Sequence, residues 1–303
     1  MFQLPQTTIQ TSPLIQGCMR LAGKTPSLVD EVLRTNLDLG INLFDHADIY
    51  AEGQSHKEFA ESMRRLKVSR DRYFLQSKAG ICKGYYDSSK KHLHQSVDKI
   101  LKELQTDYLD LFLIHRPDPL THFEEVAETF DDLYQSGKVR YFGVSNFSMQ
   151  QLISLQYYTD QPLVVNQLQF GPAHAALITQ GIRVNMIQSE SMVNVEGLLD
   201  YMQRKKITLQ AWSPFQVNLQ EGLFMNHPKY NQLTDTIRGI AFDHQTSFEA
   251  IVIAWLLKHP AKMQPIIGTM TPQRVKDSAD GIGISLSKEE WYRIYQAGNG
   301  KLP

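Results

Sequence analysis

The sequence is poor in cysteine, in long apolar runs and in charge of one sign. It has two cysteines, Cys18 and Cys82, in 303 residues, which gives no sign of the disulfide framework that small secreted proteins carry. The first ten residues, MFQLPQTTIQ, have neither the basic start nor the apolar stretch of a secretory signal. The longest apolar run extends from Ala250 to Leu257, far short of the roughly 20 residues that cross a bilayer. We therefore expect a cytoplasmic protein with no membrane partner.

Neither sign of charge is in excess. Lys plus Arg number 31 and Asp plus Glu number 32, which gives a formal net charge of −1. A domain that binds nucleic acid usually has a basic excess gathered on one face, and this sequence has none. We expect no nucleic-acid partner. We expect instead a small-molecule substrate and a chain that is a monomer or a weak oligomer.

Short β-branched runs alternate with longer segments of helical period, and no linker rich in Gly, Ser or Pro divides the chain. Most of the short runs are apolar on both faces, as are strands of a parallel sheet covered by helices. About eight strand–helix units in roughly 300 residues predict an α/β protein with a (β/α)8 TIM barrel as its single domain, residues 1–303. The predicted strands are Pro13–Gly17, Ile41–Asp45, Tyr73–Lys78, Leu109–His115, Val139–Ser145, Leu163–Gln169, Ile207–Trp212 and Gln264–Gly268. The opening segment, Phe2–Gln10, is predicted to form an N-terminal β-hairpin that plugs the lower end of the barrel.

Helix start and stop signals support this division of the chain. Thr25 precedes a proline, which suits the first helical position. Thr246 with Glu249, and Ser287 with Glu290, have the spacing of capping boxes. Ser89–Leu104 and Thr121–Ser136 have apolar stripes of helical period, and Gly40 and Gly137 stand where helices should end. The rival fold, an open doubly wound sheet, normally carries G-x-G-x-x-G after its first strand, and that loop is absent here.

Four reactive side chains fall at the ends of neighbouring predicted strands. Asp45 ends the second strand and Tyr50 follows it, Lys78 ends the third, and His115 ends the fourth. Each alone has an ordinary structural explanation, but barrel enzymes gather reactive groups at the C-terminal ends of their strands. A nearby ammonium should lower the pKa of the tyrosine, a carboxylate should hold that ammonium, and a histidine can orient a carbonyl oxygen. Such a set polarises and protonates a carbonyl while a cofactor supplies hydride.

These residues resemble the aldo-keto reductase family. The segment from Gly40 to Tyr50 is similar to its first signature, and Lys78 and His115 fall where its other two catalytic residues do. Gly143–Phe147, Asn166-Gln167 and Ala211–Pro214 resemble its nicotinamide-binding motifs, with Trp212 in place of a stacking tyrosine. The resemblance runs from about Pro13 to about Ser278 and is closest in style to stand-alone bacterial members and potassium-channel beta subunits.

The resemblance implies an NADPH-dependent oxidoreductase that reduces aldehyde or ketone carbonyls to alcohols. Tyr50 is then the general acid, Lys78 tunes it, Asp45 holds Lys78, and His115 orients the carbonyl. Arg274 and Thr269 match ligands of the NADPH 2′-phosphate, although Gly268 replaces a common lysine, and Asp277-Ser278 replace a Glu-Asn pair at adenine. The implied NADP+ or NADPH contacts are Met19, Arg20, Asp45, Ser145, Asn146, Gln167, Trp212, Ser213, Pro214, Phe215, Gly268, Thr269, Arg274, Asp277 and Ser278. A regulatory or scaffold protein that binds the cofactor, senses redox state and reduces carbonyls slowly stays open as an alternative.

The substrate cannot be read from these motifs, because the loops over a barrel mouth set it. Residues 171–194 and 215–230 are the expected walls. Phe170, Met186, Met192, Phe215 and Phe224 suggest an apolar or aromatic pocket, though core packing explains such residues equally well. No metal site is expected, because His92 and His94 form an isolated pair on a predicted exposed helix.

Overall fold

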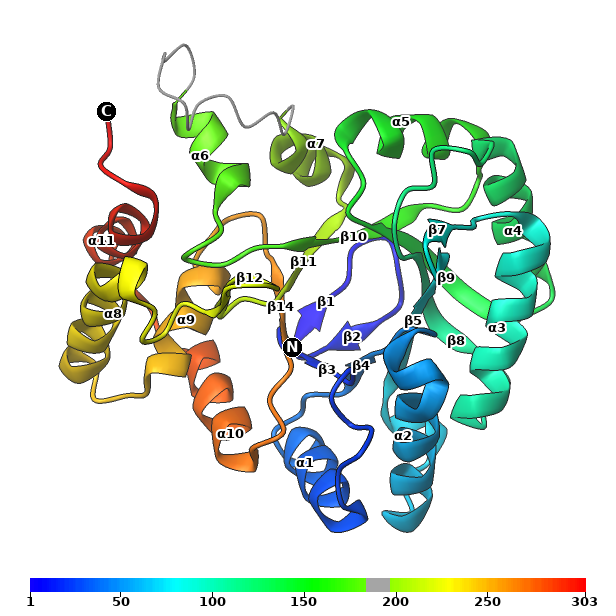
Figure 1. Ribbon diagram of the computed structural model, residues 1–303, viewed down its shortest axis with the longest axis horizontal. Coiled ribbons are helices and arrows are strands. Elements are labelled where there is room, and N and C mark those ends of the chain that lie inside the picture. Colours follow the sequence, from blue (N-terminus) through cyan, green and yellow to red (C-terminus); the bar gives the residue numbers. More distant parts are fainter. Residues whose placement is uncertain (184–196) are drawn as a thin grey trace.

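The computed structural model describes residues 1–183 and 197–303. Within these residues, eight parallel strands close into a barrel, with helices packed around its outside (Figure 1). Around the barrel the strands follow the order β10-β11-β14-β3-β4-β5-β8-β9, in which β9 also pairs with β10. The predicted (β/α)8 barrel is confirmed.

All eight predicted strands are present, each within two residues of its predicted ends. Their apolar side chains are buried on both faces because helices cover the outside and side chains fill the inside. The strands are β3 (Ile15–Gly17), β4 (Leu43–Asp45), β5 (Phe74–Ala79), β8 (Leu109–Ile114), β9 (Val139–Ser145), β10 (Leu163–Gln169), β11 (Thr208–Trp212) and β14 (Gln264–Ile267).

The helices bury the stripes that their sequences predict. In α3 (Lys90–Leu104) the side chains of Leu93, Val97 and Ile100 are buried, and the Ser89 hydroxyl caps the first turn. The other helices are α1 (Pro26–Asp38), α2 (Gln54–Arg65), α4 (Phe123–Gln135), α5 (Met149–Tyr158), α6 (Ala176–Ile182), α7 (Leu198–Lys205), α8 (Asn231–Asp243), α9 (Phe248–Leu257), α10 (Pro272–Asp280) and α11 (Lys288–Asn299). Four short 3₁₀ helices in the described residues are η1 (Tyr50–Gly53), η2 (Arg70–Arg72), η4 (Pro228–Tyr230) and η5 (Gly281–Gly283).

The predicted helix caps are confirmed except at one helix. Thr25 caps α1, Ser287 and Glu290 form a reciprocal capping box on α11, and glycines follow the ends of α1 and α4 with positive φ. The capping box predicted for Thr246 and Glu249 is wrong. Ser247 is the cap of α9, and its hydroxyl accepts from the Ala250 amide at 3.0 Å, so Thr246 lies one residue outside the helix.

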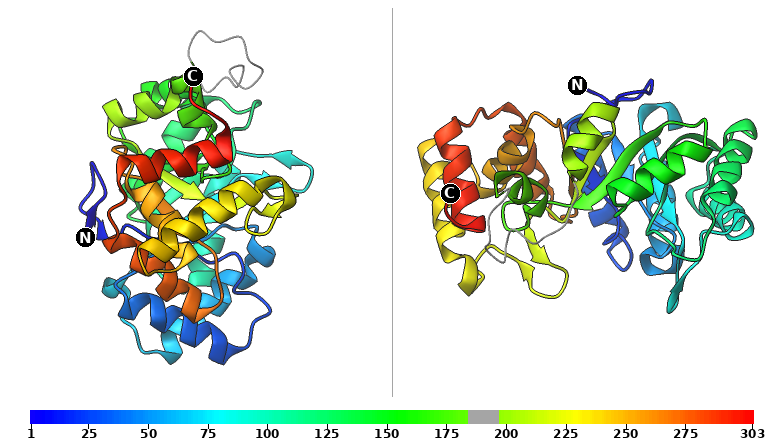
Figure 2. Two further views of the ribbon diagram at one scale, coloured as in Figure 1. Left: turned by 90° about the vertical axis from the view of Figure 1, so that its left-hand side faces the viewer. Right: turned by 90° about the horizontal axis from the view of Figure 1, so that it is seen from above.

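The N-terminal hairpin plugs the barrel, as predicted. Strands β1 (Phe2–Gln3) and β2 (Gln10–Thr11) pair antiparallel, and the turn between them carries the buried side chains of Leu4 and Ile9. These two side chains pack in one cluster with inward residues of the barrel strands. Two other hairpins, β6 (Ile81–Cys82) with β7 (Tyr85–Tyr86) and β12 (Gln216–Asn218) with β13 (Gly222–Leu223), lie at the opposite end of the barrel (Figure 2).

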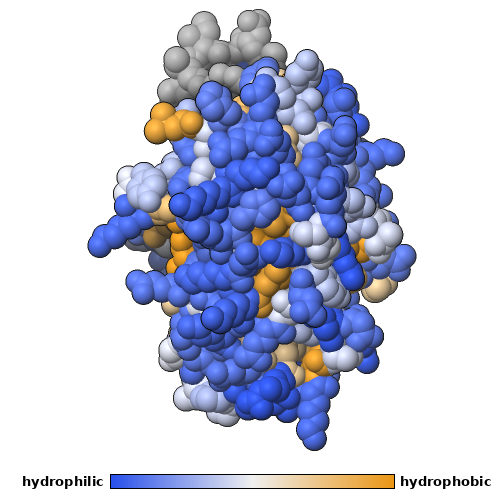
Figure 3. Space-filling view, turned by 90° about the vertical axis from the view of Figure 1, so that its right-hand side faces the viewer, coloured by the Kyte–Doolittle hydropathy of each residue, from blue (hydrophilic) through white to orange (hydrophobic). Residues whose placement is uncertain are grey.

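The largest hydrophobic cluster fills the layer between the barrel and its helices. Helix α9 is buried over most of its surface because α8, α10 and η5 pack against it. Its Trp255 stacks between Phe170 and Trp291, with ring centroids 5.8 Å and 5.1 Å away. The outer surface on the side that carries α3 and α4 is mainly hydrophilic (Figure 3). No helix in the two described ranges is long and apolar enough to span a membrane.

Candidate active site

The C-terminal ends of the barrel strands open into a pocket of about 660 Å³, a size common for small-molecule sites. Asp45, Tyr50 and His115 line it, and Lys78 lies directly behind it. Every predicted cofactor residue except Asp277 also lines the pocket: Met19, Arg20, Ser145, Asn146, Gln167, Trp212, Ser213, Pro214, Phe215, Gly268, Thr269, Arg274 and Ser278. Residues far apart in sequence therefore meet at one end of the barrel.

A buried ion pair lies at the base of the pocket. The Lys78 ammonium donates to Asp45 Oδ1 at 2.6 Å, and the amides of Gln76 and Gln167 donate to the same oxygen at 2.6 Å and 3.0 Å. Lys78 is fully buried and Asp45 is almost so. Burial lowers the pKa of Lys78, and the charge of Asp45 opposes that shift. The charge of Asp45 therefore favours the charged form of the buried ammonium.

Tyr50 is held above this pair by η1. Its ring lies 5.4 Å from the Lys78 nitrogen and meets the His115 ring edge to face, with centroids 6.3 Å apart. Contrary to the expectation from sequence, the pKa of Tyr50 is raised well above 10, first by burial and then by the charge of Asp45. The Lys78 ammonium, which was expected to lower this pKa, does not outweigh these two effects. They favour the protonated form of the phenol.

The turn that follows Tyr50 is left-handed over three residues. Ala51 and Glu52 have φ of 48° and 55°, and Gly53 has φ of 88°, a conformation that costs a non-glycine residue about 1–2 kcal/mol. The carboxylate of Glu103 occupies the space that a Cβ at position 53 would need. The φ of 88° favours glycine at this position, and Gly53 leaves room for the Glu103 side chain of α3 beside the loop that carries Tyr50.

A polar cluster missed by the sequence reasoning lies behind this loop. His56 of α2 is fully buried, with Nδ1 3.0 Å from Glu103 and Nε2 3.2 Å from Ser77, the neighbour of Lys78. Burial lowers the pKa of His56, against the opposing pull of Glu103. A signal was available, because Glu103 follows Ile100 by three residues and so falls on the apolar stripe of α3.

His115 is uncharged in its place beside Tyr50. Burial, with the positive charges of Lys78 and Arg116 adding to it, lowers the pKa of His115 to about 2. Its Nδ1 is buried and has no hydrogen-bond partner among the described residues. A neutral imidazole has one N–H to donate, so His115 can hydrogen-bond an oxygen that enters the pocket.

On the strand ends across the barrel from Tyr50, polar groups form a connected set. The Ser145 hydroxyl donates to the Gln167 carbonyl at 3.0 Å, and the Asn146 amide donates to Ser145 at 2.7 Å. The Trp212 indole N–H lies 3.4 Å from the Asn146 side-chain oxygen, so its ring is held at the pocket wall. Hydroxyl, amide and aromatic groups in this arrangement suit a flat ring that carries a carboxamide, as nicotinamide does.

The other end of the pocket is basic. Arg20 donates to the Gly268 carbonyl at 2.8 Å, and its guanidinium lies 2.7 Å from where a Cβ at position 268 would be. Glycine at 268 thus makes room for Arg20, which brings a cation to the place where the lysine common in the family is absent. Arg274, in the first turn of α10, lies 3.7 Å from Glu249 and is largely exposed. Two arginines at a helix N-terminus suit a phosphate group.

The adenine-end residues are placed less favourably. Asp277 does not line the pocket, and its carboxylate accepts from Gln273 one turn earlier. Ser278 lines the pocket, but its hydroxyl is already bonded to the Arg274 carbonyl at 2.8 Å. The pairing of these two residues with adenine stays a prediction, and the geometry of Asp277 does not favour it.

The expected apolar wall is only partly confirmed. Phe215 lines the pocket, together with Leu219, Leu223 and Met225 around the β12–β13 hairpin. For Phe170 and Phe224 the core explanation holds, because both are buried between the barrel and its helices. Met186 and Met192, with the rest of residues 184–194, lie outside the described residues.

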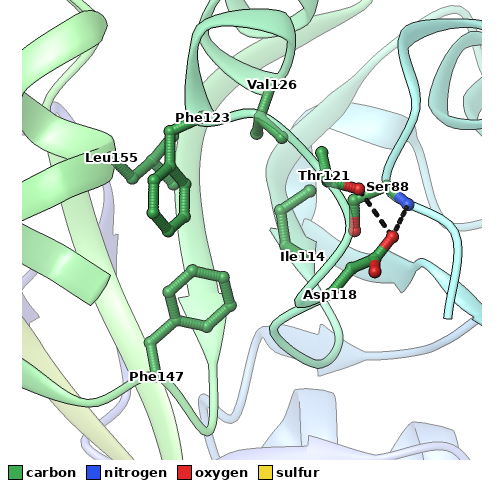
Figure 4. A pocket seen from close by; sticks show the side chains of 8 residues that line it. All are labelled: Ser88, Ile114, Asp118, Thr121, Phe123, Val126, Phe147 and Leu155. Carbon is green, nitrogen blue, oxygen red and sulfur yellow. Dashed lines mark hydrogen bonds between the residues drawn. The ribbon is translucent and has the colours of Figure 1, made fainter.

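A second, far smaller cavity lies near α4 and α5, away from these groups. It has about 10 Å³ of free space between apolar side chains and the polar residues Ser88, Asp118 and Thr121 (Figure 4). The Asp118 carboxylate accepts from the Ser88 amide and from the Thr121 hydroxyl. A space of this size holds about one water molecule, so it is not a substrate site.

Comparison with known proteins agrees with the geometry. The Aldo/keto reductase family model matches residues 13–299. The chain is 34% identical over 277 residues to oxidoreductase YdhF of Escherichia coli, covering 88% of this chain and 86% of that protein. It is 29% identical over 306 residues to 6-dehydroglucose reductase of Agrobacterium fabrum, covering 97% and 96%. An aldo/keto reductase of Klebsiella pneumoniae, solved with NADP and acetate, matches with a TM-score of 0.74 at 24% identity, covering 94% of this chain and 90% of that one. With its barrel, its strand-end residues and a family match over nearly its whole length, this chain belongs to the aldo/keto reductase family of oxidoreductases.

Proposed function

We propose that this protein is an NADPH-dependent reductase that converts aldehyde or ketone carbonyls to alcohols, with Tyr50 as the proton donor. The observation that carries the proposal is the position of Tyr50. Its phenol lies beside neutral His115 and above the buried Asp45–Lys78 pair, in a pocket of about 660 Å³. Relatives named as oxidoreductase and as 6-dehydroglucose reductase support a reductase with a small carbonyl substrate.

The residues act on the carbonyl oxygen. Tyr50 donates its hydroxyl proton to that oxygen, and His115 donates an N–H hydrogen bond that polarises and orients it. The Lys78 ammonium stabilises the phenolate that proton transfer leaves, and Asp45 keeps that ammonium charged and in place. When bound, NADPH supplies the hydride that forms the new bond to the carbonyl carbon.

The proposed cofactor rests on the two ends of the pocket. Ser145, Asn146 and Gln167 offer hydrogen bonds to a carboxamide, and Trp212 offers a face for stacking. Arg274 and Arg20 offer cations to phosphate groups. The Klebsiella pneumoniae structure, which shares this fold, is solved with NADP, and this agrees with the assignment.

The test removes only the phenolic oxygen. Tyr50→Phe should lower kcat for an aldehyde by about 10²–10⁴-fold, the range of general acid contributions, while the Kd for NADPH stays nearly unchanged. Tyr85→Phe is the matched control, because Tyr85 is largely exposed on β7 and does not line the pocket. Retention of more than half of wild-type turnover by Tyr50→Phe, with hydride transfer shown to limit the rate, would contradict the role of Tyr50. Tight NADPH binding without turnover of any carbonyl by the wild type would favour the redox-sensing alternative.

A further inference from the structure

Arg116 is the residue next to the catalytic histidine. It follows His115 directly after the end of β8, and both side chains line the pocket with Tyr50. Arg116 is partly exposed. Its positive charge adds to the effect of burial in lowering the pKa of His115.

Arg116 differs from the other cations of the site in having no partner within the part of the chain that the structure describes. Lys78 is bonded to Asp45, Arg20 is bonded to the Gly268 carbonyl, and Arg274 faces Glu249. Among residues 1–183 and 197–303, no hydrogen bond or ion pair to the Arg116 side chain is found.

The acidic residue nearest to Arg116 in sequence is not available to it. The carboxylate of Asp118 accepts from the amides of Ser88 and Leu120 and from the Thr121 hydroxyl. These bonds hold the carboxylate at the small second cavity (Figure 4). The positive charge of Arg116 is therefore not neutralised from its own loop.

Apolar side chains line the same pocket as Arg116. The register of β5 and β8 pairs Ala79 with Ile114, so Ile81 and Arg116, each two residues further on, leave neighbouring strand ends together. Ile81 and Ile49 line the same pocket. An anion that enters such surroundings loses water and needs a cation in return, and a guanidinium offers a carboxylate or phosphate two parallel hydrogen bonds.

We propose that Arg116 makes this pocket selective for carbonyl substrates that carry an oxyanion, a carboxylate or a phosphate, a short distance from the reacting carbon. This inference rests on the proposed reductase function and adds the substrate class to it. Tyr50 and His115 hold the carbonyl oxygen, and Arg116 holds the charged end of the same molecule. A neutral carbonyl compound of the same size would bind with the guanidinium unpaired.

The experiment compares matched pairs of aldehydes with saturating NADPH. 4-Carboxybenzaldehyde is set against its neutral methyl ester, and glyceraldehyde 3-phosphate against glyceraldehyde, so that the two kinds of oxyanion are separated. In the wild type, kcat/KM should favour the anionic member of at least one pair by about 10- to 100-fold, the worth of a hydrogen bond to a charged group. Arg116→Gln should bring that ratio close to one by lowering kcat/KM for the anion alone. Arg116→Lys should restore part of the preference.

Lys83→Gln is the control for net charge, because Lys83 is exposed in the turn after Ile81 and does not line the pocket. It should leave both ratios at their wild-type values. A wild-type ratio near one in both pairs would overturn the inference and leave the reductase function standing. An equal loss of kcat/KM for both members of each pair in Arg116→Gln would also overturn the inference. Such a loss would mean that the guanidinium acts on the carbonyl or on hydroxyl groups. Absence of turnover with all four aldehydes would overturn the proposed function and the inference together.

Discussion

The buried pair of Lys78 and Asp45 allows a sharp prediction about stability. Asp45→Asn keeps the shape of the side chain and one oxygen that can still accept from Lys78, Gln76 and Gln167. It removes the negative charge that faces a fully buried ammonium and puts an NH2 group in place of Oδ2. Removing one partner of a buried ion pair costs about 3–5 kcal/mol, because the other charge stays out of water uncompensated. We therefore expect Asp45→Asn to lower the free energy of unfolding by about that amount near neutral pH.

The pH dependence of this loss has a definite sign. Burial already lowers the pKa of Lys78, and Asp45 is the main influence that raises it, so Asp45→Asn lowers it further. At pH values between this lowered pKa and the unfolded-state pKa of lysine, near 10.4, Lys78 binds a proton in the unfolded chain but not in the folded chain. Stability then rises with pH by about 1.4 kcal/mol per unit. The loss of stability in Asp45→Asn should therefore shrink as the pH rises towards 10. The wild type should show a rise of stability with pH over a narrower range, because its Lys78 has the higher pKa.

Urea unfolding, followed by far-UV circular dichroism at several pH values, measures both effects. The double variant Asp45→Asn/Lys78→Met is the control, since it removes both charges and should recover most of the lost stability at neutral pH. A single variant that loses less than about 1 kcal/mol, with no dependence on pH between 7 and 10, would refute the view that Asp45 holds Lys78 charged. So would a double variant no more stable than the single one.

Two further predictions concern the cofactor. Arg274→Ala should raise the Kd for NADPH far more than the Kd for NADH in fluorescence titrations, because only NADPH carries the 2′-phosphate. Glu249→Gln should lower the Kd for NADPH, because it removes the negative charge that faces Arg274. Equal weakening of both cofactors would show that Arg274 does not bind that phosphate. Trp212→Phe should abolish most of the cofactor-induced change in tryptophan emission while binding persists, because Trp255 and Trp291 are stacked in the core. An undiminished change in folded Trp212→Phe would place the nicotinamide elsewhere.

The barrel could be predicted because its signals are local and repeated. Each strand is a short run that is apolar on both faces, and each helix has a stripe of period 3.6, so neither depends on distant contacts for its recognition. The confirmed ends of β9 and β10, which are Val139–Ser145 and Leu163–Gln169, illustrate this. Helix starts were less secure. Thr246 and Ser247 can both cap a helix, and only the backbone angles at the start of α9 select Ser247.

The gathering of the candidate catalytic residues could also be predicted, because strand ends of a barrel meet at one face. What could not be predicted is the balance of charge around them. The ammonium of Lys78 and the carboxylate of Asp45 are both evident in the sequence, but the direction of the Tyr50 pKa depends on burial and on which charge lies nearer. Likewise, Phe170 and Phe215 are the same residue type, and they follow the ends of two neighbouring strands, β10 and β11. Only the packing of Trp255 against Phe170 decides that Phe170 belongs to the core.

The position of the Tyr50 hydroxyl depends on contacts that the family motif does not include. The loop after it passes through three consecutive residues with positive φ, which Ala51 and Glu52 adopt only at a cost. A side chain from outside the loop packs against it. The Glu103 carboxylate fills the space over Gly53 and bonds to His56, and His56 reaches Ser77. Ser77 precedes Lys78 on β5, so one chain of contacts connects the loop that carries Tyr50 with the strand that carries Lys78. The distance between the phenol and the ammonium is therefore set by the packing of α2 and α3 on β5 as much as by the motif itself.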